Sequence, residues 1–248
     1  MRLRSLLIVA WLVLGAAPAW AAITWDTATA NGNPTADTAD SFTHTIGTGS
    51  NVYVGVCVTS NGTDGSGSID VSSLTVNGSA ATFRAASDTV SQGASVKTEY
   101  WDAVLGSTNG AVTVAVNVSA NDRFRTTAFS LFGVDQTTPV GTAATTEVTS
   151  TSASVNVSSA VNELVMSCLG VNMTSSAWTV GAGQTERWLN STDINATAEQ
   201  GSSEPGGATV TMSHSWTTVQ YASLIAIPIK PASATVATPT LMLLGVGN

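Results

Sequence analysis

Apolar residues alternate with small or polar residues along much of this chain. The pattern is clearest over residues 52–59 and 112–118, where valine occupies every second position. Successive side chains of a β-strand point to opposite faces of its sheet, so a period of two predicts strands with one apolar face. No segment shows the period of about 3.6 residues that marks an amphipathic helix. The alternation is typical of an antiparallel sheet with one buried face.

The composition favours strands as well. Thr, Ser, Val, Ala and Gly are abundant, whereas the residues that sustain exposed helices are scarce. Strands this regular can bury enough apolar surface to offset the chain entropy, which argues against a disordered Ser/Thr-rich stalk. We therefore expect residues 22–230 to form one all-β domain, a jelly-roll-like antiparallel β-sandwich with an irregular entry over residues 26–41. Residues 231–248 are expected to form a C-terminal tail.

The first 21 residues have the features of a secretory signal peptide. Arg2 and Arg4 precede an unbroken apolar run over residues 6–14, and small residues at 19 and 21 form an A-x-A cleavage site. The apolar run is about half of the roughly 20 residues that a membrane-spanning helix needs. The sequence therefore predicts a secreted, extracellular or cell-surface protein whose mature chain has no membrane span.

The charge balance excludes one class of partner. The chain has 8 basic and 16 acidic residues, so the formal charge of −8 becomes −10 once Arg2 and Arg4 leave with the signal peptide. Binding to a phosphate backbone needs clustered Lys and Arg. We therefore expect no nucleic-acid partner.

The sequence also contains an internal similarity between two of its parts. Residues 50–57 match residues 161–168 at an offset of 111, with cysteine aligned on cysteine, and later segments keep the same order at offsets that fall steadily to about 95. Shorter loops in a second copy would produce this steady fall. The pattern predicts two diverged repeats, over about 42–134 and 153–229, that together close the sandwich.

The two cysteines, Cys57 and Cys168, occupy equivalent positions of these repeats. Export would place them where disulfides persist. If the halves pack about a pseudo-twofold axis, equivalent residues near that axis approach each other. We therefore expect a disulfide, with two separate buried thiols as the alternative.

Catalytic residues are hard to find. His44 and His214 lie outside any H-E-x-x-H frame, and no G-x-S-x-G elbow occurs, so both histidines are interpreted as structural. Glu99 and Asp102 suggest a glycosidase pair, but residues three apart in a strand point to opposite faces. We expect neither an enzyme nor a cofactor.

Two further features suggest ligands. The loop over residues 61–70 has oxygen ligands and glycines suited to calcium in outline, but it does not match an EF-hand loop, so we expect a solvated loop and no metal site. Trp178 and Trp188 flank a glycine-rich turn at 181–183, where an exposed ring could stack on a sugar. The alternative is that both tryptophans pack in the core.

Three segments carry a resemblance to known proteins. They are SFTHTIG followed by GSN over residues 41–51, FGVDQTTPV over residues 132–140, and GAGQTERW over residues 181–188. In these segments the chain resembles a loosely defined group of secreted bacterial β-sandwich modules, which occur alone or within large surface proteins. The resemblance covers most of residues 40–230, and it implies an extracellular, non-catalytic module without an established ligand site.

These features give an order of preference among three candidate functions. A structural or adhesive surface module comes first, with a surface glycan or a second copy as candidate partner. The apolar string over residues 241–246 follows a Pro/Ala/Thr-rich linker and is too short to span a membrane, so it could add a strand to a sheet of another copy. The alternative is a carbohydrate-binding module that uses Trp178 and Trp188, and a glycoside hydrolase is a distant third.

Overall fold

The computed structural model describes residues 21–32, 37–62, 69–89, 95–172, 177–191 and 197–233. Within these ranges the regular elements are all β-strands, and they pair in antiparallel sheets that pack as a sandwich. The predicted all-β antiparallel sandwich is therefore confirmed. The same ranges contain no helix of the length and apolar character that a membrane crossing requires.

Residues 21–132, which we call the N-terminal half, form two sheets. The central sheet has the order β1-β9-β3-β7-β6, and the outer sheet has the order β2-β8-β4-β5. The first strand pairs with the last and the second with the last but one, as in a jelly roll. The expectation of an irregular entry over residues 26–41 is therefore wrong for the described residues 26–32 and 37–41, which belong to paired strands. The strands are β1 (Thr24–Gly32), β2 (Asp37–Ile46), β3 (Val52–Gly62), β4 (Val71–Val76), β5 (Ser79–Ala80), β6 (Thr82–Asp88), β7 (Ser95–Gly106), β8 (Gly110–Asp122) and β9 (Phe124–Phe132).

Residues 133–233, the C-terminal half, form one sheet of order β10-β15-β11-β14-β13, with β12 paired to β15 beside this path. The long strand β10 pairs with residues 210–215 and 220–226 of β15, with a register irregularity between Ser150 and Ser152. The strands are β10 (Ala144–Val157), β11 (Leu164–Asn172), β12 (Thr179–Val180), β13 (Thr185–Asn190), β14 (Thr197–Pro205) and β15 (Val210–Ile229).

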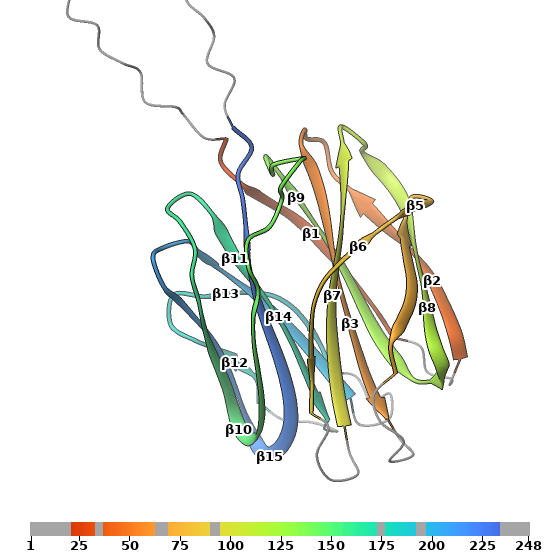
Figure 1. Cartoon of the computed structure of the whole chain (residues 1–248), viewed down its shortest axis with the longest axis vertical. Coiled ribbons are helices and arrows are strands. Elements are labelled where there is room, and N and C mark those ends of the chain that lie inside the picture. Colours follow the sequence, from red (N-terminus) through yellow and green to blue (C-terminus); the bar gives the residue numbers. More distant parts are fainter. Residues whose placement is uncertain are drawn as a thin grey trace, which may run out of the picture.

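The ribbon of β10 and β15 folds back over its own sheet. Met212, near the start of β15, packs with Val165 of β11 and with Ala226, near the end of β15. The molecule is therefore a stack of β-layers, with the C-terminal half on one side of β3 and β7 and the outer sheet on the other (Figure 1). This stack is thicker than a sandwich of two sheets, because each half supplies layers of its own.

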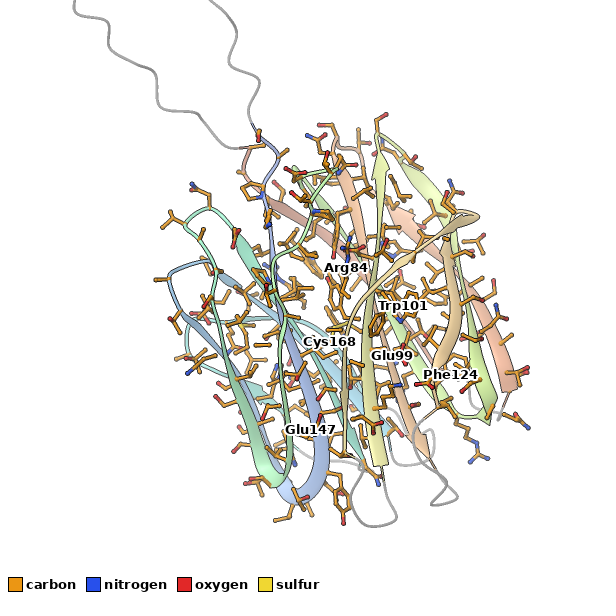
Figure 2. The ribbon with its side chains drawn as sticks, viewed as in Figure 1. Arg84, Glu99, Trp101, Phe124, Glu147 and Cys168 are labelled. Atoms are coloured by element: carbon orange, nitrogen blue, oxygen red, sulfur yellow. A yellow bond between two sulfur atoms is a disulfide. The ribbon has the colours of Figure 1, made fainter. Side chains whose placement is uncertain are left out.

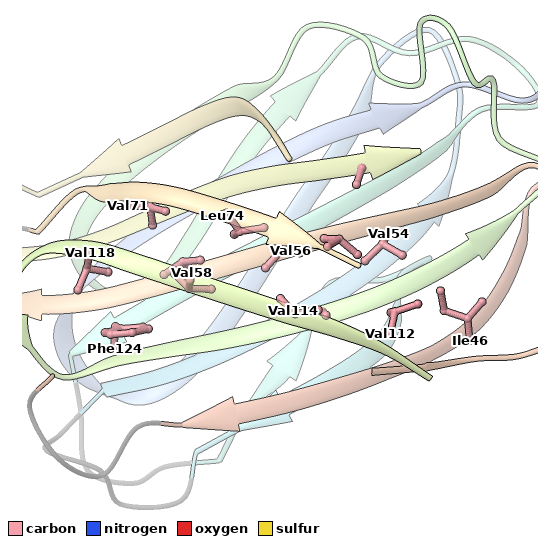
Figure 3. Close-up of a cluster of buried hydrophobic side chains, with 14 of the residues drawn as sticks. Ile46, Val54, Val56, Val58, Val71, Leu74, Val112, Val114, Val118 and Phe124 are labelled. Atoms are coloured by element: carbon pink, nitrogen blue, oxygen red, sulfur yellow. The ribbon is translucent and has the colours of Figure 1, made fainter. Parts of the chain in front are cut away.

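The outer core lies between the outer and central sheets of the N-terminal half (Figure 3). Its valines come from every second position of β3 and β8, as the alternation predicts. The set is Val52, Val54, Val56 and Val58 on β3 and Val112, Val114, Val116 and Val118 on β8.

The middle core lies between the two halves, and it uses the other face of β3. Tyr53 and Cys57 point into it, together with Phe129 of β9 and Met166 of β11. Both faces of β3 are therefore buried, whereas the sequence pattern predicts one buried face. Gly55 leaves room for this packing, since a Cβ built there would lie 2.3 Å from the Phe129 ring.

Asn77 and Gly78 form the turn that joins β4 to β5. Both residues have positive φ, 52° and 77°. Two successive residues in this region give the tight hairpin turn that Asn-Gly favours. The local sequence alone determines this feature.

The two ends of the described chain lie side by side. The Ala21 N–H donates to the Ala232 carbonyl at 3.1 Å, Pro231 bridges to Val134, and the Ala232 N–H donates to the Gly133 carbonyl at 2.7 Å. Residues 231–233 are thus part of the folded body, which extends slightly beyond the expected boundary at residue 230. Residues 234–248, including the apolar string, lie outside the described ranges.

Candidate functional site

Trp188 is buried in the middle core. Its ring is 6% exposed and stacks on Phe129 with ring centroids 5.3 Å apart, and its Nε1 donates to Glu199 Oε1 at 3.0 Å. It lies against Gly201, whose missing side chain makes room for the indole. Of the two interpretations of Trp188, packing in the core is the one found, because the turn at 181–183 is followed by a strand that points this ring inward.

Trp178 lies elsewhere. It is half-buried and packs on Trp216 with ring centroids 5.9 Å apart, in the core inside the C-terminal half. Trp178 and Trp188 thus belong to separate cores, and the structure does not bring them together as one aromatic platform.

Cys57 and Cys168 form a disulfide, as predicted. Their Cα atoms are 6.2 Å apart, within the range that a disulfide allows. The bond joins β3 to β11, which face each other across the middle core rather than pairing within one sheet. It therefore adds a covalent cross-link between the two halves of the chain.

Glu99 and Asp102 point to opposite faces of β7, as expected from their spacing. Glu99 accepts from Trp101 Nε1 at 2.9 Å and pairs with Lys97 Nζ at 2.9 Å. Asp102 pairs with Arg84 Nε at 2.8 Å, and burial raises the pKa of this carboxyl although Arg84 opposes the shift. The two carboxylates cannot flank one glycosidic bond.

His214 makes a contact that resembles a nucleophile and its base. Its Nδ1 donates to Gln200 Oε1 at 2.8 Å, and its Nε2 lies 2.9 Å from Ser167 Oγ. All three side chains are buried, and burial lowers the pKa of His214 to about 3. The orienting group is a neutral amide rather than a carboxylate, so nothing stabilises an imidazolium, and the pair is structural.

His44 makes a similar contact in the N-terminal half. Its ring bonds Thr29 Oγ1 at 2.8 Å and Ser130 Oγ at 3.0 Å. Ser130 gives its proton to Asp26 at 2.7 Å, so His44 must donate to this hydroxyl and cannot act on it as a base. Burial lowers the pKa of His44, with Asp26 opposing. Both histidines are thus hydrogen bonded in the interior, as the sequence analysis expects.

A buried ionic network connects the two halves. Arg125 of β9 donates from Nε to the Thr197 carbonyl at 2.6 Å and also bonds the Asn190 side chain. Glu199, fully buried nearby, has its pKa raised to about 7 by burial, against the effect of hydrogen bonds and of Arg125. Sequence patterns do not reveal this network, because its members come from strands far apart in the chain.

A groove of about 590 Å³ lies where the two halves meet. One wall is β6, the edge strand of the central sheet, and the other is the segment that leads into β10, the edge strand of the C-terminal half. Small side chains on both walls leave the space open. The groove is lined by Phe83, Arg84, Ala85, Ala86, Val140, Gly141, Thr142, Ala143, Thr145 and Lys230.

The groove ends where the two edges touch. Ser87 Oγ donates to the Thr146 carbonyl at 3.1 Å, and the Asp88 N–H donates to Glu147 Oε1 at 3.0 Å. In the view of Figure 2, Arg84 lies toward the top of this boundary and Glu147 toward its lower end. The walls are therefore held at a fixed separation, so the groove exists before any ligand arrives.

Residues 63–68 of the possible calcium loop lie outside the described ranges. Asp70, which ends the loop, pairs with Lys97 Nζ. Among the described residues, no group of three or more His, Cys, Asp or Glu side chains could hold a metal ion.

Comparisons with known proteins identify no relative. No family model matches the chain, and no curated protein or solved structure matches it either.

Proposed function

We propose that the protein is a secreted structural or adhesive surface module. One observation carries this proposal. The serine–histidine contacts of the described residues are sealed in the interior, while an open groove between two sheet edges faces solvent. The disulfide, the signal-peptide pattern and the resemblance to secreted bacterial β-sandwich modules support an extracellular location.

The proposal includes an origin by duplication. The order β1-β9-β3-β7-β6 in the N-terminal half parallels β10-β15-β11-β14-β13 in the C-terminal half. A register irregularity falls at Arg84, between β6 and β7, and another at Arg187, between β13 and β14. Both observations support two copies of one ancestral unit that came to share a middle core.

Location is tested on cells that express the full chain. The expected product lies outside the cell, begins at Ala22, and has a mass two hydrogens below that of the dithiol. Digestion of intact cells with an added protease should remove any cell-attached fraction. A cytoplasmic product with two alkylatable thiols would contradict the proposal.

Assembly through the C-terminal strand forms a second part of the proposal. The edge strands β6 and β10 could each accept an added strand. Because residues 231–233 belong to the folded body, the test deletes only residues 234–248. Light scattering during size-exclusion chromatography should show larger species for the full chain than for the shortened one. Identical profiles would exclude this mode of assembly.

Carbohydrate binding is the second candidate function. Phe83, on the rim of the groove, is 48% exposed, and this observation favours a sugar site there rather than at the buried Trp188. Binding on a glycan array with quenching of tryptophan fluorescence would support this function. Absence of both binding and quenching would exclude it.

A further inference from the structure

We propose that the groove between β6 and the start of β10 binds an acidic polysaccharide. Arg84 and Lys230 would hold its carboxylates, and Phe83 would contact the apolar face of a sugar ring. This inference rests on the proposed adhesive role and names its ligand class.

The two cations that line the groove, rather than the net charge of the chain, support a carboxylate-bearing ligand. The chain is strongly acidic, and several of its cations are already engaged: Lys97 pairs with carboxylates, Arg125 is buried, and Arg187 lies over the Trp25 ring. In Arg84, by contrast, only Nε is used, by Asp102, and the described residues offer no partner to the two terminal nitrogens. Lys230 makes no ion pair within 4 Å with the described residues, although its charge helps to lower the pKa of the Asp135 carboxyl. Arg84 and Lys230 therefore both bring hydrogen-bond donors without a partner among the described residues to the lining of this groove.

The aromatic side chain supports a sugar. Phe83 is the only aromatic among the large exposed apolar side chains of the described residues. Trp101 packs behind it edge to face, with ring centroids 5.3 Å apart, so the ring is held in place. A fixed aromatic face beside polar groups suits a pyranose, which has an apolar face and a polar rim. An acidic peptide would supply the carboxylates but no comparable ring face.

The shape of the groove fits a short segment of a polysaccharide. Ala85, Ala86, Gly141 and Ala143 line it with little bulk, and the hydroxyls of Thr142 and Thr145 provide further hydrogen-bonding groups. Its volume of about 590 Å³ lies within the roughly 300–1,000 Å³ of small-molecule sites. A short stretch of an extended polysaccharide would fill it.

The test measures binding of the disulfide-bonded protein to immobilised polygalacturonate. We expect binding that weakens as salt is added, no binding to the fully methyl-esterified polymer, and weaker binding to polyglutamate. Absence of binding to polygalacturonate would overturn the inference while leaving the proposed surface location intact. Polyglutamate binding as strong as that of polygalacturonate would also overturn it, and would assign the groove to acidic peptides.

Two variants locate the site. Lys230→Gln and Phe83→Ser should each weaken binding about fivefold. Asn121→Asp is the matched control for charge. Like Lys230→Gln it makes the net charge of the protein more negative by one, but residue 121 lies on β8 of the outer sheet. Val219→Ser is the control for loss of an exposed apolar side chain. Thermal unfolding checks that each variant is folded, and equal losses in variants and controls would contradict the site.

Discussion

Trp188 and Gly201 are register partners on β13 and β14, and the indole ring lies across the position that a side chain of residue 201 would occupy. A Cβ built on Gly201 would come within 2.1 Å of two ring atoms. The ring cannot move aside easily, because it is stacked on Phe129 and hydrogen bonded to Glu199.

Gly201→Ala should therefore lower the free energy of unfolding by about 3 kcal/mol, as expected for overpacking around a fixed ring. Gly207→Ala is the matched control, since nothing lies within 4 Å of a Cβ there, and it should change stability by less than about 0.5 kcal/mol. Chemical denaturation measures both. In a Trp188→Ala background the cost of Gly201→Ala should largely vanish, and an unchanged cost would contradict the steric explanation.

The disulfide should be a major source of stability. The double variant Cys57→Ala/Cys168→Ala is expected to lose about 3 kcal/mol, because a bond between residues separated by 111 positions restricts the unfolded chain. Guanidinium unfolding with and without reductant checks this. Reductant should lower the midpoint of the wild type and leave the variant unchanged. A wild-type midpoint that stays fixed after full reduction would refute the prediction.

Glu199 should make stability depend on pH. Its pKa is about 7 in the folded protein against an ordinary 4.5. Between these values the unfolded chain loses the proton while the folded chain keeps it, so the free energy of unfolding falls as pH rises, by about 3 kcal/mol at most. Glu199→Gln should abolish this fall and still accept the Trp188 hydrogen bond.

His214 opposes this trend, so the wild-type curve alone does not isolate Glu199. The pKa of His214 falls from 6.5 to about 3 on folding, so its contribution is present above pH 6.5 and is lost as pH falls toward 3. The informative quantity is the stability of Glu199→Gln minus that of the wild type, measured from pH 4 to pH 8. It should grow with pH between 4.5 and 7, and parallel curves would contradict the assignment.

The histidines can be followed directly by NMR. The ring resonances of His214 should not shift between pH 8 and pH 5, and the midpoint of His44 should lie below 6.5. In urea both should titrate near their ordinary pKa of about 6.5. A midpoint near 6.5 for His214 in the folded protein would mean that its ring is solvated rather than buried.

The features set by local sequence are the ones that sequence analysis predicts. Valine at every second position of residues 112–118 specifies the buried face of β8, and Asn77-Gly78 specifies its turn. The pairing of Cys57 with Cys168 is predicted because both parity and the internal match point to it.

The burial of the polar strand β14 is not predicted by its sequence. Its sequence, TAEQGSSEP, has no apolar face, yet residues 197–203 are buried. It lies between β11 and β13, and Arg125, Trp188 and His214 donate hydrogen bonds to the Thr197 carbonyl, Glu199 and Gln200 of this strand. Partners as distant as Arg125 leave no periodic signal, so neither the buried network nor the groove between the halves can be derived from spacing.

The adjacent chain ends give the molecule a particular response to mechanical load. A pull applied at Ala22, where the mature chain is expected to begin, and at Ala232 first separates the short pairings of residues 231–232 with residues 133–134. Beyond that point the force passes through the bond between Cys57 and Cys168, which bypasses everything between these residues. Tension would therefore extend only the segments before Cys57 and after Cys168, and the chain between these two residues would carry no load.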